Sequence, residues 1–242
     1  MVKITSPFRI TVVEYPKSGG TWLVGILGDY FDIPKRDIYM ADGYNAFDVS
    51  KHPWYRNAVS LNMTETCVIK SHELPGSSLH NYPTEYIHLV RDGRDVVVSK
   101  YFFEKDFCVQ NGIFASFDTP WAEYVQKTAE EWSNFVLSWM KVDEGQHWFR
   151  YEDLLAQPFE TARKMITALQ CEIDDQKLIL AIENNTKEKI HQSMESAFSH
   201  NTFVRKARAG DWANHFSPKD IHVFNLVAEK AMKVLGYVEL GL

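Results

Sequence analysis

Short runs of β-branched and other apolar residues alternate along the chain with longer segments in which apolar residues recur every three or four positions. The short runs predict β-strands at residues 9–15, 67–70, 85–91 and 147–153. The longer segments predict helices at residues 21–31, 92–105, 128–141, 156–169 and 217–237. Strands that alternate with helices pair in parallel through right-handed crossovers, and their ligands bind at the carboxyl ends of the strands. We therefore expect an α/β fold with a central parallel sheet flanked by helices.

The chain has enough apolar residues for one large core. Its 242 residues are 45% hydrophobic and 14% aromatic, and no repeat, low-complexity tract or linker divides them. We therefore expect a single domain over residues 1–242. Within the predicted helix at 128–141, four large apolar residues have helical spacing and are expected in the core. They are Trp132, Phe135, Trp139 and Met140.

The last predicted helix carries its own start signal. Ser217 and Asp220 have the spacing of a capping box, and Pro218 takes the first helical position. These residues predict that the helix begins directly after Ser217.

Charge and cysteine content limit the partners and the compartment. The net charge of −6 gives no general attraction to nucleic acid or to a membrane surface, so an anion must be held by a local group of donors. Cys67, Cys108 and Cys171 are odd in number and far apart, which favours reduced thiols. The N-terminal segment lacks a basic stretch followed by a long apolar run, and no run of eighteen apolar residues occurs. We expect a soluble cytoplasmic protein that binds neither nucleic acid nor membrane.

The segment YPKSGGTW, residues 15–22, lies between the first predicted strand and the first predicted helix. Its backbone N–H groups are expected to point into one concavity at the positive end of the helix dipole, which suits an anion. The two glycines let the backbone approach a ligand closely, and a lysine, two hydroxyl groups and an indole ring add a charge, donors and a stacking face. These residues are Lys17, Ser18, Gly19, Gly20, Thr21 and Trp22. Together they suit a phosphorylated nucleotide, although a glycine pair before a helix can also be an ordinary turn and cap.

This loop resembles the 5′-phosphosulfate loop, YPKSGTTW, of the sulfotransferases that use 3′-phosphoadenylyl sulfate, and differs where Gly20 replaces a threonine. Four further segments resemble the same family in the expected order, so the resemblance extends from residue 9 to residue 216. They are IKSHELP at 69–75, LVRDGRDVVVSKYFF at 89–103, FRYEDLLAQP at 149–158 and FVRKARAGDWANHF at 203–216. The resemblance implies the P-loop NTPase-like sulfotransferase fold, with 3′-phosphoadenylyl sulfate as donor and 3′,5′-adenosine bisphosphate as product. Sulfonate transfer does not inherently need a metal ion, and we expect no metal site.

The resemblance also implies roles in binding the donor. Lys17 would hold the bridging oxygen between phosphate and sulfonate, Ser18 to Thr21 would bind the 5′-phosphate, and Trp22 would stack on adenine. Arg91 and Ser99 match the 3′-phosphate pair, while Arg205, Lys206 and Ala207 match a loop that closes over this phosphate. Tyr151 matches a residue that contacts adenine, and residues 184–189 are expected to touch the nucleotide although their sequence departs from the family pattern.

Some of these assignments have alternatives. Tyr151 could be an ordinary core residue, and the charged run of Arg205, Lys206 and Arg208 could be only a solvated face. Arg91 could instead form a surface ion pair with Asp92 or Asp95. Ala207 stands where the family has glycine, so a loop that needs a positive φ there is strained or follows another path.

The resemblance implies a transfer site made of Lys17, Lys70, His72 and Ser99. His72 follows the strand at 67–70 and matches the general base of the family, a role that its titration range suits. Lys70 matches the lysine that contacts the sulfonate, and its side chain can point to the same side of an extended strand as that of His72. Considered alone, His72 could be a hydrogen-bonded loop histidine and either lysine an ordinary exposed one.

Aromatic residues suggest an acceptor pocket for a small hydrophobic or aromatic alcohol, or an amine, although core packing explains many of them equally well. The first group is Tyr30, Phe31, Tyr39, Tyr44, Phe47, Trp54 and Tyr55. The second group is Phe102, Phe103, Phe107, Phe114, Phe117, Trp121 and Tyr124. The dimerisation element of the family is not visible between Lys189 and Phe203, so a monomer or a homodimer is possible.

Two rival functions remain open at this point. A P-loop kinase or other phosphotransferase would need Mg²⁺, but the spacing GxxxxGK[ST] is absent and Asp92 is the only strand-end acid that resembles a metal ligand. A non-catalytic protein that binds adenosine bisphosphate would keep the phosphate-binding segments and leave His72 idle.

Overall fold

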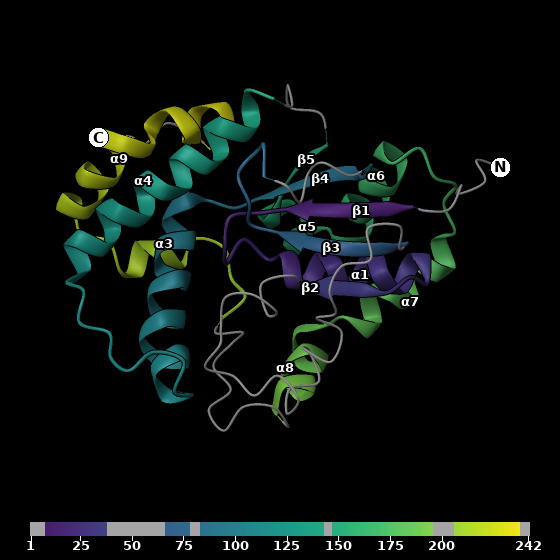
Figure 1. Cartoon of the computed structure of the whole chain (residues 1–242), viewed down its shortest axis with the longest axis horizontal. Coiled ribbons are helices and arrows are strands. Elements are labelled where there is room, and N and C mark those ends of the chain that lie inside the picture. The colour runs from purple at the N-terminus through teal and green to yellow at the C-terminus, as the bar shows by residue number, and fades with distance from the viewer. Residues whose placement is uncertain (1–7, 38–65, 78–82, 143–146, 196–205, 238–242) are drawn as a thin grey trace.

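A parallel β-sheet runs through the middle of the molecule (Figure 1). The computed structural model describes residues 8–37, 66–77, 83–142, 147–195 and 206–237. Within them the sheet has five strands in the order β2-β3-β1-β4-β5. The strands are β1 (Arg9–Val13), β2 (Lys35–Asp37), β3 (Cys67–Ser71), β4 (Glu85–Val90) and β5 (Trp148–Arg150). All four neighbouring pairs are parallel, so the expected α/β fold with a central parallel sheet is confirmed.

Strand β1 is the central strand, and every one of its five residues is buried. In the register of the sheet, Val12 lies opposite Lys70 and Val13 lies opposite both Ser71 and His88. The segments that follow β1, β3 and β4 therefore leave the sheet at the same edge. This edge is where the sequence predicts the ligand site.

Helices cover the sheet in two groups, each with its own hydrophobic cluster. The first cluster joins the sheet to α1 (Gly20–Phe31), α5 (Tyr151–Ala156), α6 (Pro158–Ala168) and α7 (Asp175–Asn184). The second cluster is built mainly from α3 (Gly93–Phe102), α4 (Trp121–Met140) and α9 (Pro218–Val234), which lie on the left in Figure 1. Helix α8 (Lys187–Glu195) follows α7. Burial of apolar side chains on both faces explains why the parallel strands are almost continuously apolar.

The predicted core stripe on α4 is largely confirmed. Trp132, Phe135 and Trp139 are buried, and Met140 is partly buried. The ring of Trp132 packs against that of Phe224 on α9, with their centroids 6.2 Å apart. The pairing of α4 with α9 therefore rests on large aromatic side chains, which contribute more buried area than any other residues.

Several elements differ from their predicted bounds. The segment 147–153 is a strand only over Trp148–Arg150, and α5 begins at Tyr151 because Glu152 and Asp153 suit the first turn of a helix. Helix α3 passes directly into a π-helix at Phe103–Cys108. Helix α4 begins at Trp121, seven residues before the predicted start at 128. The apolar pattern of the chain does not predict β2, α7 or α8.

The three cysteines are free thiols, as predicted. Cys67 and Cys108 are buried and Cys171 is partly buried. Within the described ranges, no helix is both long and apolar enough to cross a membrane.

The capping box at the start of α9 supports the first testable prediction. The Ser217 hydroxyl accepts from the Asp220 N–H at 3.3 Å, and the Asp220 carboxylate accepts from the Ser217 N–H at 2.8 Å. Because the N-cap hydroxyl satisfies an otherwise unpaired helical N–H group, Ser217→Ala should destabilise the protein by about 1 kcal/mol. Thermal unfolding should then show a Tm lower by about 2–4 °C. The exposed neighbour Lys219 supplies the control Lys219→Ala, and equal Tm values for the two variants would contradict the assigned cap.

Candidate functional site

The loop between β1 and α1 is shaped by glycine. Gly19 is the N-cap of α1, has a left-handed backbone with φ 103°, and makes no side-chain cap. A Cβ at this position would also lie 2.5 Å from a ring carbon of Tyr151. Both the positive φ and the close approach therefore require glycine here. Lys17 has a positive φ of 76° as well, so the loop turns sharply on each side of Ser18.

Donors in this loop remain available to an anion. The Ser18 hydroxyl is buried and has no hydrogen-bond partner among the described residues. In the same part of the chain, the backbone hydrogen bonds of the loop use the N–H groups of Ser18, Trp22 and Leu23, while those of Gly19 and Thr21 are not used. A buried polar group without a partner is costly unless a ligand completes it. The loop therefore fits a phosphate at the positive end of α1.

Two lysines bring positive charge to this loop. The Lys70 ammonium lies 3.4 Å from the Thr21 hydroxyl, and the Lys17 ammonium lies 3.9 Å from the centroid of the Phe103 ring. Burial, followed by repulsion from Lys70, lowers the pKa of Lys17 to about 7. An anion bound between the two ammonium groups would relieve this repulsion and restore the full charge of Lys17.

His72 lies directly after β3, as predicted, and is partly buried. Its Nδ1 atom is 2.8 Å from the backbone carbonyl oxygen of Glu14. A carbonyl oxygen can only accept, so Nδ1 carries a proton and Nε2 is the basic nitrogen of the neutral ring. The bond therefore fixes the tautomer of the neutral ring.

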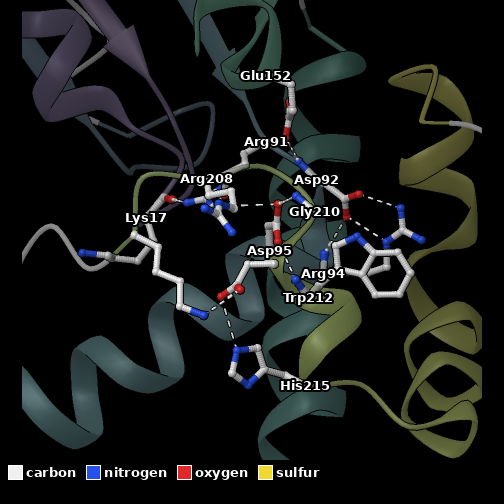
Figure 2. Close-up of polar contacts among 12 residues, drawn as sticks. Lys17, Arg91, Asp92, Arg94, Asp95, Glu152, Arg208, Gly210, Trp212 and His215 are labelled. Carbon is white, nitrogen blue, oxygen red and sulfur yellow. Dashed lines mark hydrogen bonds and ion pairs between the residues drawn. The ribbon is translucent and has the colours of Figure 1, made fainter. Parts of the chain in front are cut away.

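Arg91 joins two loops that are far apart in sequence (Figure 2). Its guanidinium donates to the carbonyl oxygen of Lys17 at 3.0 Å and to that of Arg208 at 3.1 Å. It also lies 4.6 Å above the Tyr151 ring and 4.0 Å from the Asp95 carboxylate. The alternative of an ion pair with Asp95 is therefore present, but Arg91 is buried, so the pair does not lie at the surface.

The neighbouring carboxylate of Asp92 is engaged by Arg94. The Arg94 side chain donates to both carboxylate oxygens of Asp92, at 2.9 and 2.6 Å, and the Arg94 backbone N–H donates to one of them at 2.9 Å. Asp92 therefore caps α3 and pairs with arginine, a role different from the metal ligand that the kinase alternative requires.

Asp95 anchors the loop at residues 206–212, which we call the lid loop. Its carboxylate is 1% exposed and accepts from the backbone N–H groups of Gly210 at 2.7 Å and Trp212 at 2.9 Å. Figure 2 shows both bonds reaching Asp95 on α3. Burial raises the pKa of Asp95, while Arg91 and the two N–H groups act in the opposite direction. The Arg94 guanidinium lies 3.8 Å from the Trp212 ring and strengthens the same attachment.

The lid loop keeps a left-handed residue although it lacks the usual glycine. Ala207 has φ 49°, so the chain accepts a strain of about 1–2 kcal/mol at this position. Lys206 pairs with Asp211 at 2.8 Å, and its carbonyl oxygen accepts from the Lys187 ammonium at 3.3 Å. Lys187, within the segment 184–189 that the resemblance expects to touch the nucleotide, thus contacts the lid loop. Arg205 lies outside the described residues.

Of the remaining site residues, Tyr151 contacts the loop and Ser99 lies further along α3. Tyr151 is buried between Gly19 and Arg91, and its ring meets Trp22 edge to face at 6.2 Å. Ser99 is partly buried on α3, and no contact in the described part of the chain joins its side chain to Arg91. The structure thus brings Tyr151 and Arg91 against the loop directly, and leaves Ser99 further along α3.

The aromatic residues expected at an acceptor pocket separate into different groups. Tyr30 and Phe31 belong to the core, because the buried Tyr30 hydroxyl donates to the Glu172 carbonyl at 2.9 Å and the Phe31 ring packs on Phe8. Core packing, the alternative left open for these residues, explains both of them. Five of the expected residues lie outside the described ranges: Tyr39, Tyr44, Phe47, Trp54 and Tyr55.

In the second group, three rings pack around Tyr101, and the other four lie in or beside the π-helix. Phe117, Trp121 and Tyr124 have centroids 4.9–5.2 Å from that of Tyr101. Phe103 stacks on Phe107 at 5.1 Å and lies under the Lys17 ammonium. Phe102 meets His215 edge to face, and Phe114 is partly buried near Cys108. Phe103 is therefore the ring of this group that borders the charged site.

The Asp95 anchor gives a prediction that needs no ligand. Asp95→Asn keeps the shape but replaces one accepting oxygen with an NH₂ group, which cannot accept from Gly210 or Trp212. Hydrogen–deuterium exchange measured by mass spectrometry should become several times faster in a peptide that contains residues 208–213. Asp118→Asn, at an exposed aspartate, should leave this peptide unchanged. Equal protection in Asp95→Asn and in the unaltered protein would show that the anchor contributes nothing.

Comparison with known proteins shows which family the chain belongs to. Sulfotransferase 2A1 of Homo sapiens is 25% identical over 92% of this chain and 84% of its own length, and sulfotransferase 1B1 of Mus musculus is 26% identical over 94% and 84%. Among solved structures, mouse sulfotransferase SULT7A1 complexed with PAP has a TM-score of 0.70 at 19% identity, covering 93% of this chain and 85% of that one. Retinol dehydratase in complex with androsterone and inactive cofactor PAP has a TM-score of 0.64 at 17% identity, covering 98% and 83%. The family model described as the sulfotransferase domain matches residues 7–236, and the chain therefore belongs to the sulfotransferase family.

Proposed function

We propose that this enzyme transfers a sulfonate group from 3′-phosphoadenylyl sulfate to a hydroxyl or amine group of a small acceptor, leaving 3′,5′-adenosine bisphosphate. The observation that carries the proposal is the convergence of Lys17, Lys70 and His72 beside an anion-binding loop at one edge of the sheet. Family membership supports sulfonate transfer in general. The bound donor would supply the activated sulfonate and a phosphate leaving group.

The loop residues fit the 5′-phosphate end of the donor. Ser18 has a buried hydroxyl without a partner among the described residues, and Gly19 has no Cβ, which would overlap the Tyr151 ring. We assign the 5′-phosphate to Ser18, Gly19, Gly20 and Thr21, although the Gly20 N–H donates to the Glu14 carboxylate in this structure. Trp22 and Tyr151 provide two aromatic rings beside this loop, and we assign adenine contacts to them.

We assign the 3′-phosphate to Arg91 and Ser99, together with the lid-loop residues Arg205, Lys206 and Ala207. Arg91 supports this because its guanidinium has five donors in a planar fork that suits a phosphate. The two bonds from Arg91 to loop carbonyls occupy part of this fork and hold the guanidinium in place.

Each charged residue then has a task in the transfer. His72 would remove the proton of the acceptor through Nε2, while its Nδ1–H group stays on the Glu14 carbonyl. Lys17 would stabilise negative charge on the bridging oxygen as the bond to sulfur breaks, and Lys70 would hold the sulfonate oxygens. Lys17 must be protonated for this role. The transfer activity is therefore present below the pKa of Lys17 and is lost as the pH rises through that pKa.

We propose a small hydrophobic or aromatic alcohol as the acceptor. Phe103 supports this choice, since its ring borders the Lys17 ammonium and stacks on Phe107. We further propose that residues 1–242 act as one sulfotransferase domain in the cytoplasm, as a monomer or a homodimer, without nucleic acid or membrane as partner.

Substitution of His72 tests the proposed base. His72→Gln keeps an N–H donor for the Glu14 carbonyl but has no basic nitrogen, so transfer of labelled sulfonate to a panel of phenols and alcohols should fall by about 10²–10⁴-fold. Binding of 3′,5′-adenosine bisphosphate should persist. At about a hundred times its dissociation constant this ligand should stabilise both proteins by about 2.7 kcal/mol, which is a Tm increase of about 5–10 °C.

The control is His222→Ala on the exposed face of α9, which should leave transfer unchanged. Full transfer by His72→Gln would refute the role of His72. A reaction that uses a nucleoside triphosphate and stops on addition of EDTA would favour a kinase instead. Nucleotide binding with no transfer by the unaltered protein to any acceptor in the panel would favour a non-catalytic binding protein.

A further inference from the structure

A buried acid lies within the phosphate-binding loop. Glu14 follows β1 directly and is 2% exposed. Its carboxylate accepts from the Gly20 N–H at 2.5 Å, at the first residue of α1. A carboxylate is rarely buried unless hydrogen bonds and positive charges compensate it. Its position beside a site for anions therefore needs a physical explanation.

Glu14 and Gly20 depend on each other sterically. A Cβ at Gly20 would overlap the carboxylate carbon and both carboxylate oxygens of Glu14. The carboxylate thus fills the space that any side chain at residue 20 would need. Gly20 is also the one residue at which the loop departs from the YPKSGTTW pattern. Glycine at this position and glutamate at residue 14 form a matched pair.

The charge of Glu14 acts on Lys17. Desolvation and then repulsion from Lys70 lower the pKa of Lys17, and Arg91 acts weakly in the same direction. Glu14 is the largest influence that raises this pKa, followed by Cys108 on the π-helix. These groups face Lys17 from β3, from the end of β4, from the loop itself and from the π-helix. Glu14 therefore offsets repulsion among three cations.

We propose that Glu14 is a positioning residue of the transfer site, which orients the first N–H group of α1 through Gly20 and supplies the counter-charge for Lys17. The same residue holds His72 through its backbone carbonyl. Its side chain thus acts on the group that stabilises the leaving oxygen, while its backbone orients the base. The contribution to transfer rests on the proposed function of Lys17, whereas the steric pairing and the effect on the Lys17 charge do not.

The first experiment measures the charge of Lys17 without any substrate. Reaction of the protein with a small amine-reactive anhydride, followed by peptide mass spectrometry, gives the reactivity of Lys17 at each pH. In Glu14→Gln the side chain keeps its size and an accepting oxygen but loses its charge, so the Lys17 titration should move to lower pH. Reaction near pH 6 should become at least threefold faster than in the unaltered protein.

Glu131→Gln is the matched control, because this exposed acid accepts from the neighbouring Tyr15 hydroxyl and does not act on Lys17. It should leave the Lys17 titration unchanged. If Glu14→Gln also leaves it unchanged while Tm is retained, a purely space-filling role is established and the counter-charge proposal is overturned. In transfer assays the fall in kcat at high pH should begin at lower pH in Glu14→Gln, which a space-filling role does not predict. Absence of all transfer would count against the proposed function and would leave the labelling result intact.

The second experiment tests the steric pair through Tm alone. Gly20→Thr should lower Tm by several degrees, because its Cβ displaces the Glu14 carboxylate. Adding Glu14→Ser removes the obstructing carboxylate, so the double variant should be more stable than Gly20→Thr. Non-additive Tm changes of this sign support direct coupling between the two residues. Additive changes, or a Gly20→Thr variant with an unaltered Tm, would overturn the pairing.

Discussion

The parallel register of β1 with its two neighbours is the constraint on which the site depends. Because Val12 lies opposite Lys70 and Val13 opposite His88, the segments after β1, β3 and β4 leave the sheet at one edge. Successive side chains of a strand point to opposite faces, so a slip of one residue would turn Lys70 away from the loop. The buried β-branched residues on both faces of β1 oppose such a slip, since it would move apolar side chains out of their clusters. Packing around the central strand thus fixes which side chains lie at the carboxyl edge of the sheet.

Two buried acidic groups compensate the positive charge at this edge of the sheet. Lys17, Lys70 and Arg91 repel one another when no anion is present, and burial increases the cost. Glu14 offsets this repulsion from within the loop, and Asp95 does so from α3 while it binds the lid loop. The site can therefore remain folded without a ligand and still attract one. The buried acids set how much positive charge remains for the donor.

Features encoded within a few residues could be predicted from the sequence. The strand–loop–helix order around residues 9–31 and the capping box at Ser217 depend on local preferences and were correct. Strand β2 was missed because its three charged residues, Lys35–Asp37, show no apolar pattern and pair only at the edge of the sheet. Helix α7 had an available signal, since Asp174 caps it by accepting from the Lys177 N–H at 3.0 Å. In the site, the loop residues could be predicted individually, but the bonds from Arg91 to Lys17 and Arg208 join residues 74 and 117 positions apart and could not.

Few other residues could replace Arg91 and keep its contacts. One guanidinium donates to two carbonyl oxygens from separate loops, and its central carbon lies 4.6 Å from the centroid of the Tyr151 ring. Lysine has the same charge but carries a single flexible ammonium. Unlike a planar guanidinium, this group is not shaped to donate to the carbonyl oxygens of Lys17 and Arg208 at the same time. Replacement of Arg91 alone would remove a hydrogen bond from each of the two loops. The contacts that join the two loops therefore constrain this residue, whatever the bound ligand.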